Sequence, residues 1–164
     1  MNTTELDFKP IVTPVFEKHG PMLYRICLSV LHDVHHAEDA VSETLLRYYS
    51  SAPKFKSEDH EKAWLIRVAR NVSIDIVRYR SRHVNVPIDS VPEELLADSD
   101  DAEERSAILS SLFSLPEIYS TPVWLYYGEG MDSRSIAKAL GISDAAARKR
   151  LSRGRELLKA KYKG

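Results

Sequence analysis

The sequence predicts an all-α protein of two small helical domains joined by an acidic linker, the C-terminal one a helix-turn-helix. Nearly every periodic segment repeats its apolar residues at helical spacing, and no segment alternates apolar and polar residues as a half-buried strand does. The charged residues fall into separate basic and acidic blocks. Residues 133–162 read as a short helix, a glycine turn and a second, basic helix. We therefore expect domains over 1–83 and 105–164, with the linker at 84–104.

Two helices are expected in the first 32 residues. The pattern over 11–19 predicts a helix only weakly, whereas residues 21–32 are apolar enough to form a buried one. Pro21 suits the first turn of that second helix, because a backbone N–H there would have no acceptor within the helix. Cys27 lies in the same apolar run, so we interpret it as a small core residue.

Two longer helices follow, over 37–51 and 60–80. The first has one apolar face and an opposite, acidic face. The second is the longest helix and carries arginines beside its apolar stripe. The apolar positions of the first are Ala37, Ala40, Val41, Thr44, Leu45 and Tyr48, and those of the second are Leu65, Val68, Ala69, Val72, Ile76 and Tyr79.

The linker differs in composition from both flanking segments. Residues 84–104 contain two prolines and eight acidic residues, with no Lys or Arg. A segment with so few large apolar residues cannot build a core, and we expect a linker or weakly ordered strap. Extended, its 21 residues would reach roughly 70 Å.

Four helices are expected after the linker, near 103–114, 116–128, 133–140 and 144–161. Ser133 can cap the third, and Gly141 can supply the left-handed residue that ends it. Ser143 can cap the fourth, with Ile142 and Ala147 spaced as a hydrophobic staple. The buried stripe of the fourth helix would be Ala147, Leu151, Gly154 and Leu158, over a core of Leu109, Leu112, Phe113, Val123, Trp124 and Tyr127.

The net charge of −1 conceals two basic segments. Residues 62–82 hold six Lys/Arg against one acid, and residues 144–164 hold eight against two. DNA responds to the potential within about 8–10 Å, so these local excesses matter more than the sum. A turn, a helix cap, an apolar stripe and a basic face together predict a helix that enters the DNA major groove.

Composition excludes several other classes. No apolar run approaches the roughly 20 residues that span a bilayer, and the N-terminus has no signal-sequence pattern. The single cysteine allows no internal disulfide, which fits a cytoplasmic location. His32, His35 and His36 form no tight Cys/His set, so we expect no metal. With no phosphate loop or nucleophile–base pair, we expect neither an enzyme nor a cofactor.

Three segments together resemble the extracytoplasmic-function (ECF) group of bacterial RNA polymerase sigma factors. AEDAVSETLLRYYSS is similar to that family's acidic helix that docks on the polymerase clamp. AWLIRVARNVSIDIVRYRSRH is similar to its promoter-melting helix. The segment from LPEIYSTPVW to GRELL is similar to its second domain. The resemblance implies a factor that binds core RNA polymerase and directs initiation by recognising the −35 element and melting the −10 element.

The resemblance assigns residues of the first domain to two tasks. Docking on the polymerase clamp would use the outer face of the 37–51 helix: Glu38, Asp39, Ser42, Glu43 and Leu46. Capture of a flipped −10 base would fall to the loop before the longest helix, where Phe55 could equally well pin the loop to the core. The arginines of that helix would hold backbone phosphates. The −10 residues would be Phe55, Ser57, His60, Arg67, Arg70, Asn71, Arg78 and Arg80.

The recognition helix of the second domain would read the −35 element. Arg148 and Lys149 can reach phosphates or guanine edges, and the small Ala145 and Ala146 can meet thymine methyl groups. Arg153 is better suited to phosphate contacts. The full set is Ser143, Ala145, Ala146, Arg148, Lys149, Ser152 and Arg153.

Five positions depart from the usual family pattern: Ser42, Ser135, Ala146, Ala147 and Gly154. They leave the promoter sequence and the strength of polymerase docking open. The resemblance also implies contact with the polymerase flap and an inhibitory anti-sigma partner. Two other functions stay open at this point, a stand-alone helix-turn-helix regulator and a polymerase-docking module without initiation activity.

Overall fold

The computed structural model describes residues 3–83 and 102–163, and all regular structure within them is helical. The all-α prediction is confirmed. Residues 84–101 of the linker expected at 84–104 lie outside the described residues, and residues 102–104 belong to the helix that follows. The helices are α1 (Thr3–Leu31), α2 (Val34–Ser51), α3 (Glu58–His83), α4 (Ala102–Phe113), α5 (Glu117–Tyr127), α6 (Ser133–Leu140) and α7 (Asp144–Lys163).

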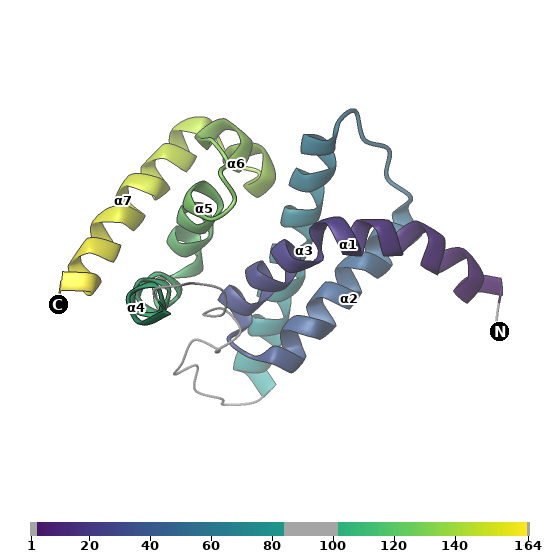
Figure 1. Ribbon diagram of the computed structural model, residues 1–164, viewed down its shortest axis with the longest axis horizontal. Helices are drawn as coiled ribbons and strands as arrows, with labels where there is room; N and C mark the ends of the chain where they lie inside the picture. The colour runs from purple at the N-terminus through teal and green to yellow at the C-terminus, as the bar shows by residue number, and fades with distance from the viewer. Residues whose placement is uncertain (1–2, 84–101, 164) are drawn as a thin grey trace.

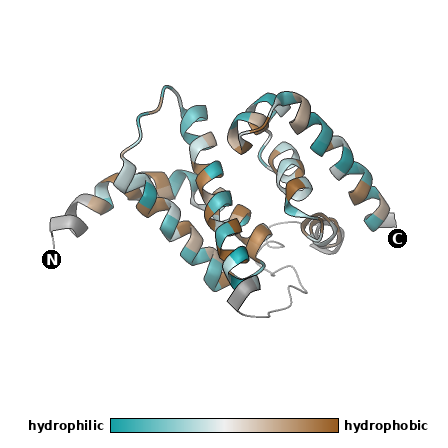
Figure 2. Ribbon diagram, turned by 180° about the vertical axis from the view of Figure 1, so that it is seen from behind, coloured by the Kyte–Doolittle hydropathy of each residue, from teal (hydrophilic) through white to brown (hydrophobic). Residues whose placement is uncertain are grey.

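The helices form two groups that lie against each other (Figure 1). Helices α1, α2 and α3 pack on one another as the N-terminal bundle, and α4 to α7 form the C-terminal bundle. Contacts between the bundles run mainly from α3 to α6 and from α1 to α5. The buried side chains of both bundles join in one apolar cluster. Figure 2 shows hydrophobic and hydrophilic bands alternating along the helices, as expected of helices with one buried face.

The expected pair of helices before residue 33 is in fact one helix, α1. It contains three prolines, Pro10, Pro14 and Pro21. Each lacks a backbone N–H and frees one carbonyl of the preceding turn. All three prolines are exposed, at spacings that place them on the solvent side of the helix. Water can therefore satisfy the freed carbonyls, and the helix continues.

Two predicted core residues lie outside the core. Tyr79, near the end of α3, has 58% of its surface exposed. The other five apolar positions predicted for this helix are buried or pack against the core. Tyr79 follows that periodicity, but it lies in the last turns of α3, near the end of the described N-terminal bundle. Tyr127 is likewise exposed, at 63%, instead of buried beneath the helix-turn-helix.

Candidate nucleic-acid interface and docking face

The helix-turn-helix is built by local hydrogen bonds at its ends. Asp132 caps α6, since its side chain accepts the N–H of Ser135 at 2.8 Å. Ser133, the predicted cap, instead donates its hydroxyl to Asp144 Oδ1 at 2.8 Å and ties the start of α6 to the start of α7. Gly141 ends α6 with a φ of 69°, as its left-handed role requires. Ser143 caps α7 as predicted, accepting the N–H of Ala146 at 3.0 Å.

The outward face of α7 is small at its centre and basic around it. Ala145, Ala146, Arg148, Lys149 and Ser152 line one shallow hollow on this face. Arg148 Nε lies 3.7 Å from a carboxylate oxygen of Asp144, and Arg153 donates to the carboxylate of Glu156 on the same helix at 3.1 Å. Such exposed pairs are weak, so both guanidinium groups remain available to a polyanion. The opposite face of α7 buries Ala147 and Leu151, as the stripe predicted.

Gly154 sets how closely α7 approaches α5. A Cβ built on Gly154 would lie 2.6 Å from Val123 Cγ2 and 3.3 Å from the carbonyl oxygen of Tyr119. No side chain larger than hydrogen fits without moving α5. The glycine that departs from the family pattern therefore has a packing reason in this chain.

The loop before α3 is anchored by an aromatic cluster. Phe55 stacks on Tyr48 with ring centroids 6.0 Å apart and meets the edge of Trp64 at the same distance. His60 packs edge-on against Phe55 at 5.3 Å and accepts the N–H of Lys56 through Nδ1. Phe55 thus packs into the protein, while His60 stays exposed at the start of α3.

Ser57 also has a structural role in this segment. Its hydroxyl oxygen accepts the N–H of His60 at 3.1 Å, which makes it the N-cap of α3. Three of the residues predicted to meet the −10 element therefore lie together at one end of α3.

Two of the predicted phosphate-binding arginines contact the C-terminal bundle, where Arg70 is largely buried and Arg67 stays exposed. Arg70 donates from Nε and Nη2 to the two carboxylate oxygens of Glu117, at 3.0 and 2.9 Å. Arg67 donates to the carbonyl oxygens of Lys138 and Ala139, at the last turn of α6. A cation at a helix C-terminus is favourable because it meets carbonyls that lack partners within the helix.

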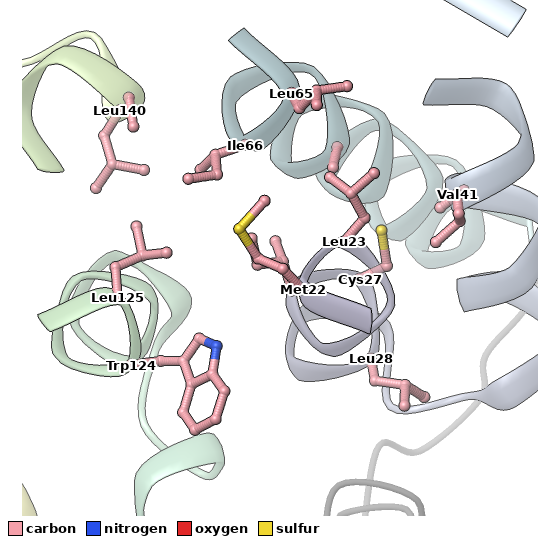
Figure 3. Close-up of a cluster of buried hydrophobic side chains, with 14 of the residues drawn as sticks. Met22, Leu23, Cys27, Leu28, Val41, Leu65, Ile66, Trp124, Leu125 and Leu140 are labelled. Carbon is pink, nitrogen blue, oxygen red and sulfur yellow. The ribbon is translucent and has the colours of Figure 1, made fainter. Parts of the chain in front are cut away.

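Apolar side chains from both bundles complete this contact. Figure 3 shows Ile66 of α3 and Met22 of α1 facing Leu125 of α5 and Leu140 of α6. All four are buried. At the edge, Lys62 Nζ lies 3.8 Å from a Glu129 carboxylate oxygen. We call this set of residues, with Arg67, Arg70 and Glu117, the closed contact.

The remaining −10 candidates lie further along α3. Asn71 and Arg78 are exposed. Arg80 donates to the carbonyl oxygen of Leu31 at 3.4 Å, at the C-terminus of α1. The structure therefore does not bring all eight −10 candidates to one surface: one group lies at the loop, one takes part in the closed contact and one lies beyond it.

The predicted docking residues share one face of α2. Glu38, Asp39 and Ser42 are exposed, and Leu46 adds an apolar side chain with 48% of its surface exposed. Glu43 is half-buried and accepts from Arg47 at 3.2 Å. The face opposite buries Ala37, Ala40, Val41, Thr44 and Leu45 between α1 and α3. The acidic face and its apolar anchor are thus arranged as the spacing predicted.

Sequence reasoning missed three carboxylates, Glu61, Glu117 and Glu129. Each pairs with a residue far away in the chain, so no local spacing identified it. Glu61 accepts from Tyr48 Oη at 3.0 Å and lies 3.2 Å from His19 Nε2. Burial, and then the Glu61 carboxylate, raise the pKa of Tyr48.

Two further expectations concern metals and membranes. In the described part of the chain, no three His, Cys, Asp or Glu side chains gather as metal ligands would. Asp33, beside the histidines considered above, instead caps α2 by accepting the N–H of His36 at 2.9 Å. Over the same residues, no helix combines the length and apolar character needed to cross a bilayer.

The chain is similar to known proteins over most of its length. Residues 15–83 match the family described as Sigma-70 region 2, and residues 105–158 match Sigma-70, region 4. It is 29% identical to the ECF RNA polymerase sigma factor SigM of Bacillus subtilis, over 92% of this chain and 94% of that protein. It is 30% identical to the ECF RNA polymerase sigma factor SigL of Mycobacterium tuberculosis, over 86% and 82% of the two chains.

A solved structure has the same fold. It is that of the sigma factor RpoE in complex with the anti-sigma factor NepR from Bartonella quintana. The TM-score is 0.69 at 22% identity, covering 92% of this chain and 96% of that one.

Proposed function

This chain belongs to the ECF RNA polymerase sigma factors, which bind core polymerase and direct promoter-specific initiation, and we propose how its residues divide that work. The observation that carries the proposal is the outward face of α7. It has small residues at its centre and cations around them, and a hydrogen-bonded cap at the turn fixes the start of the helix. The C-terminal bundle reads the −35 element, and the N-terminal bundle docks on the polymerase and opens the −10 element.

At the −35 element, α7 enters the major groove with its hollow toward the base edges. Arg148 and Lys149 supply the donors for guanine, and the methyl-sized Ala145 and Ala146 allow close approach. Arg153 binds phosphate, which adds affinity without base preference. Ser143 acts by capping α7 and aiming its first turn, because its hydroxyl is already used by the backbone.

At the −10 element, the loop over 52–57 captures a base that leaves the stack. Unstacking costs a few kcal/mol, so melting requires a pocket that holds the displaced base. His60 offers an exposed ring beside that loop, with Phe55 as its support. Asn71, Arg78 and Arg80 would follow the melted strand along α3.

The exposed face of α2 binds core polymerase. Carboxylates and one apolar side chain suit a partner helix that is basic with an apolar groove. The chain contributes no catalytic group of its own in this proposal, since RNA synthesis belongs to the core enzyme. It works in the cytoplasm, where polymerase and chromosome meet.

The closed contact must separate for this function. Arg70 cannot hold a phosphate while its guanidinium is buried against both carboxylate oxygens of Glu117, and Arg67 has two of its three guanidinium nitrogens bound to carbonyl oxygens of α6. The two promoter elements also lie apart along the DNA, so one chain must present its two bundles at a distance. The 84–104 segment is long enough to allow this separation.

An anti-sigma factor is the partner we propose for the inactive state. The similar RpoE structure contains such a protein. The anti-sigma factor would bind a surface of this chain that is partly acidic and partly apolar and includes the α2 face. Inhibitor and polymerase would then compete for the same residues.

Run-off transcription tests the proposal as a whole. Core polymerase with this chain should initiate at defined positions on a randomised template library, and the selected templates should share two spaced sequence elements. A stand-alone regulator would select a palindrome without polymerase, and a docking module without initiation activity would bind core enzyme but yield no transcript. Either result would refute the assignment.

A further inference from the structure

A single carboxylate joins the three helices of the N-terminal bundle directly beneath the loop. Glu61, in the first turns of α3, lies 3.2 Å from His19 Nε2 of α1. Its other oxygen accepts the hydroxyl of Tyr48 of α2 at 3.0 Å. The His19 side chain is 7% exposed and that of Glu61 23%, so both hydrogen bonds are largely shielded from water.

These bonds fix orientations that packing alone would leave open. A carboxylate accepts hydrogen bonds in defined directions, whereas an apolar side chain of similar size fills space without aiming its neighbours. With His19 holding one oxygen, the other is aimed at Tyr48. The bond holds the hydroxyl end of the Tyr48 side chain in place, and with it the position of the ring.

The Tyr48 ring in turn supports the loop. Phe55 stacks on it with an interplanar angle of 28° and a centroid distance of 6.0 Å. The other face of the cluster is closed by Trp64, edge-on to Tyr48 at 5.8 Å. Phe55 is the loop residue that makes ring contacts with the N-terminal bundle, so the place of the loop depends on the ring beneath it.

We propose that Glu61 is a positioning residue for promoter melting, which acts through the Tyr48 hydroxyl to hold the 52–57 loop in the shape that captures a −10 base. The inference rests on the proposed function of that loop. Glu61 does not touch DNA in this account. It is distinct from the acidic residues of the α2 face, because it points inward and binds protein on both sides.

Two variants and one control test it. Glu61→Leu removes both hydrogen bonds at similar volume. Tyr48→Phe removes only the hydroxyl and leaves the stacked ring, so the fold should persist. Glu17→Gln removes an exposed carboxylate from α1 that the aromatic cluster does not involve.

Each protein is bound to core polymerase and titrated with a single-stranded −10 oligonucleotide. The oligonucleotide carries the sequence that the wild-type holoenzyme selects from a randomised pool. A matched set carries one abasic site at each position in turn. Affinity for core polymerase is measured in parallel.

We expect the wild-type protein and Glu17→Gln to lose about tenfold or more in affinity at one abasic position, as the loss of a stacked base should cause. Glu61→Leu and Tyr48→Phe should bind the intact oligonucleotide about tenfold more weakly and be indifferent to that abasic site, with core binding unchanged. A structural role alone would weaken all oligonucleotides equally and keep the abasic penalty.

The inference is overturned if Tyr48→Phe keeps the wild-type affinity and abasic penalty, whatever Glu61→Leu does. Failure of the wild-type holoenzyme to select any sequence would instead refute the proposed function. Because Tyr48→Phe retains the ring, its result can be interpreted even if Glu61→Leu fails to fold.

Discussion

Replacing Glu117 by alanine should open the closed contact. Glu117 receives two hydrogen bonds from Arg70, and the side chains are 26% and 15% exposed. Exposed ion pairs contribute up to about 1 kcal/mol, and removing one partner of a buried pair costs roughly 3–5 kcal/mol. A partly buried, bidentate pair lies between these limits, at about 2 kcal/mol. Since about 1.4 kcal/mol is a factor of ten, the ratio of open to closed molecules should rise about thirtyfold.

Two labels on exposed helix positions would report the opening. Cysteines introduced at Ser50 on α2 and Lys159 on α7 carry a dye pair, and energy transfer gives the distribution of distances. The native thiol will not compete for label, because burial raises the pKa of Cys27 to about 11. The Glu117→Ala protein should show a larger fraction of long distances than wild type.

The same variant should bind single-stranded DNA more tightly without polymerase. Apparent affinity scales with the fraction of binding-competent molecules, so the gain can reach the factor by which opening increases. Glu17→Gln removes one negative charge elsewhere on the surface and measures the purely electrostatic contribution. Two results together would refute this role of the closed contact: Glu117→Ala gives the wild-type distribution of label distances, and it binds single-stranded DNA no more tightly than Glu17→Gln does. The closed contact would then not control access to Arg67 and Arg70.

Three further outcomes are expected. Gly154→Ala should lower the free energy of unfolding by about 1 kcal/mol in urea titration, because overlap with Val123 outweighs the gain of about 1 kcal/mol in helix propensity; a raised midpoint would contradict this. Asp33→Ala should cost about 1 kcal/mol at pH 7. The N–H of His36 lowers the pKa of Asp33 in the folded protein. The stabilisation by the Asp33 carboxylate is therefore present above the ordinary pKa of about 3.9 and lost as pH falls through the lower pKa of the folded state. Below that pH the free energies of unfolding of the two proteins should converge. Arg148→Ala should weaken promoter binding by roughly 1–3 kcal/mol and relax base preference at one −35 position, while equal loss on every sequence would indicate a phosphate contact.

The elements that could be predicted from the sequence are those set by residues near one another in the chain. Gly141 and Ser143 were identified correctly because a left-handed turn residue and a helix cap each act within a few residues. The same logic failed by one position at Ser133, since Asp132 and Ser133 are both good caps and local preference does not rank them. The side chain of Ser133 found a tertiary partner, Asp144.

Contacts between distant segments could not be predicted in this way. Arg70 and Glu117 are 47 residues apart, and His19 and Glu61 are 42 apart. Helical periodicity says that Arg70 flanks the apolar stripe of its helix, which fits a phosphate contact and a protein carboxylate equally well. Only the way α5 and α6 pack on α3 decides between them, and that packing depends on the whole apolar cluster.

The positions of the three proposed surfaces imply an order of events. The α2 docking face and the α7 recognition face are exposed in the closed arrangement, whereas Arg70 is largely buried against Glu117 and the exposed Arg67 is bound to carbonyl oxygens of α6. Polymerase can therefore bind the N-terminal bundle before the bundles separate, and a −35 contact pulls the C-terminal bundle away only once DNA is present. Arg70, which we propose to bind melted DNA, would then be released last, and this disfavours unproductive binding of single strands by the free protein. This order requires that core polymerase bind the closed and the opened protein with similar affinity, so Glu117→Ala should change DNA binding far more than it changes core binding.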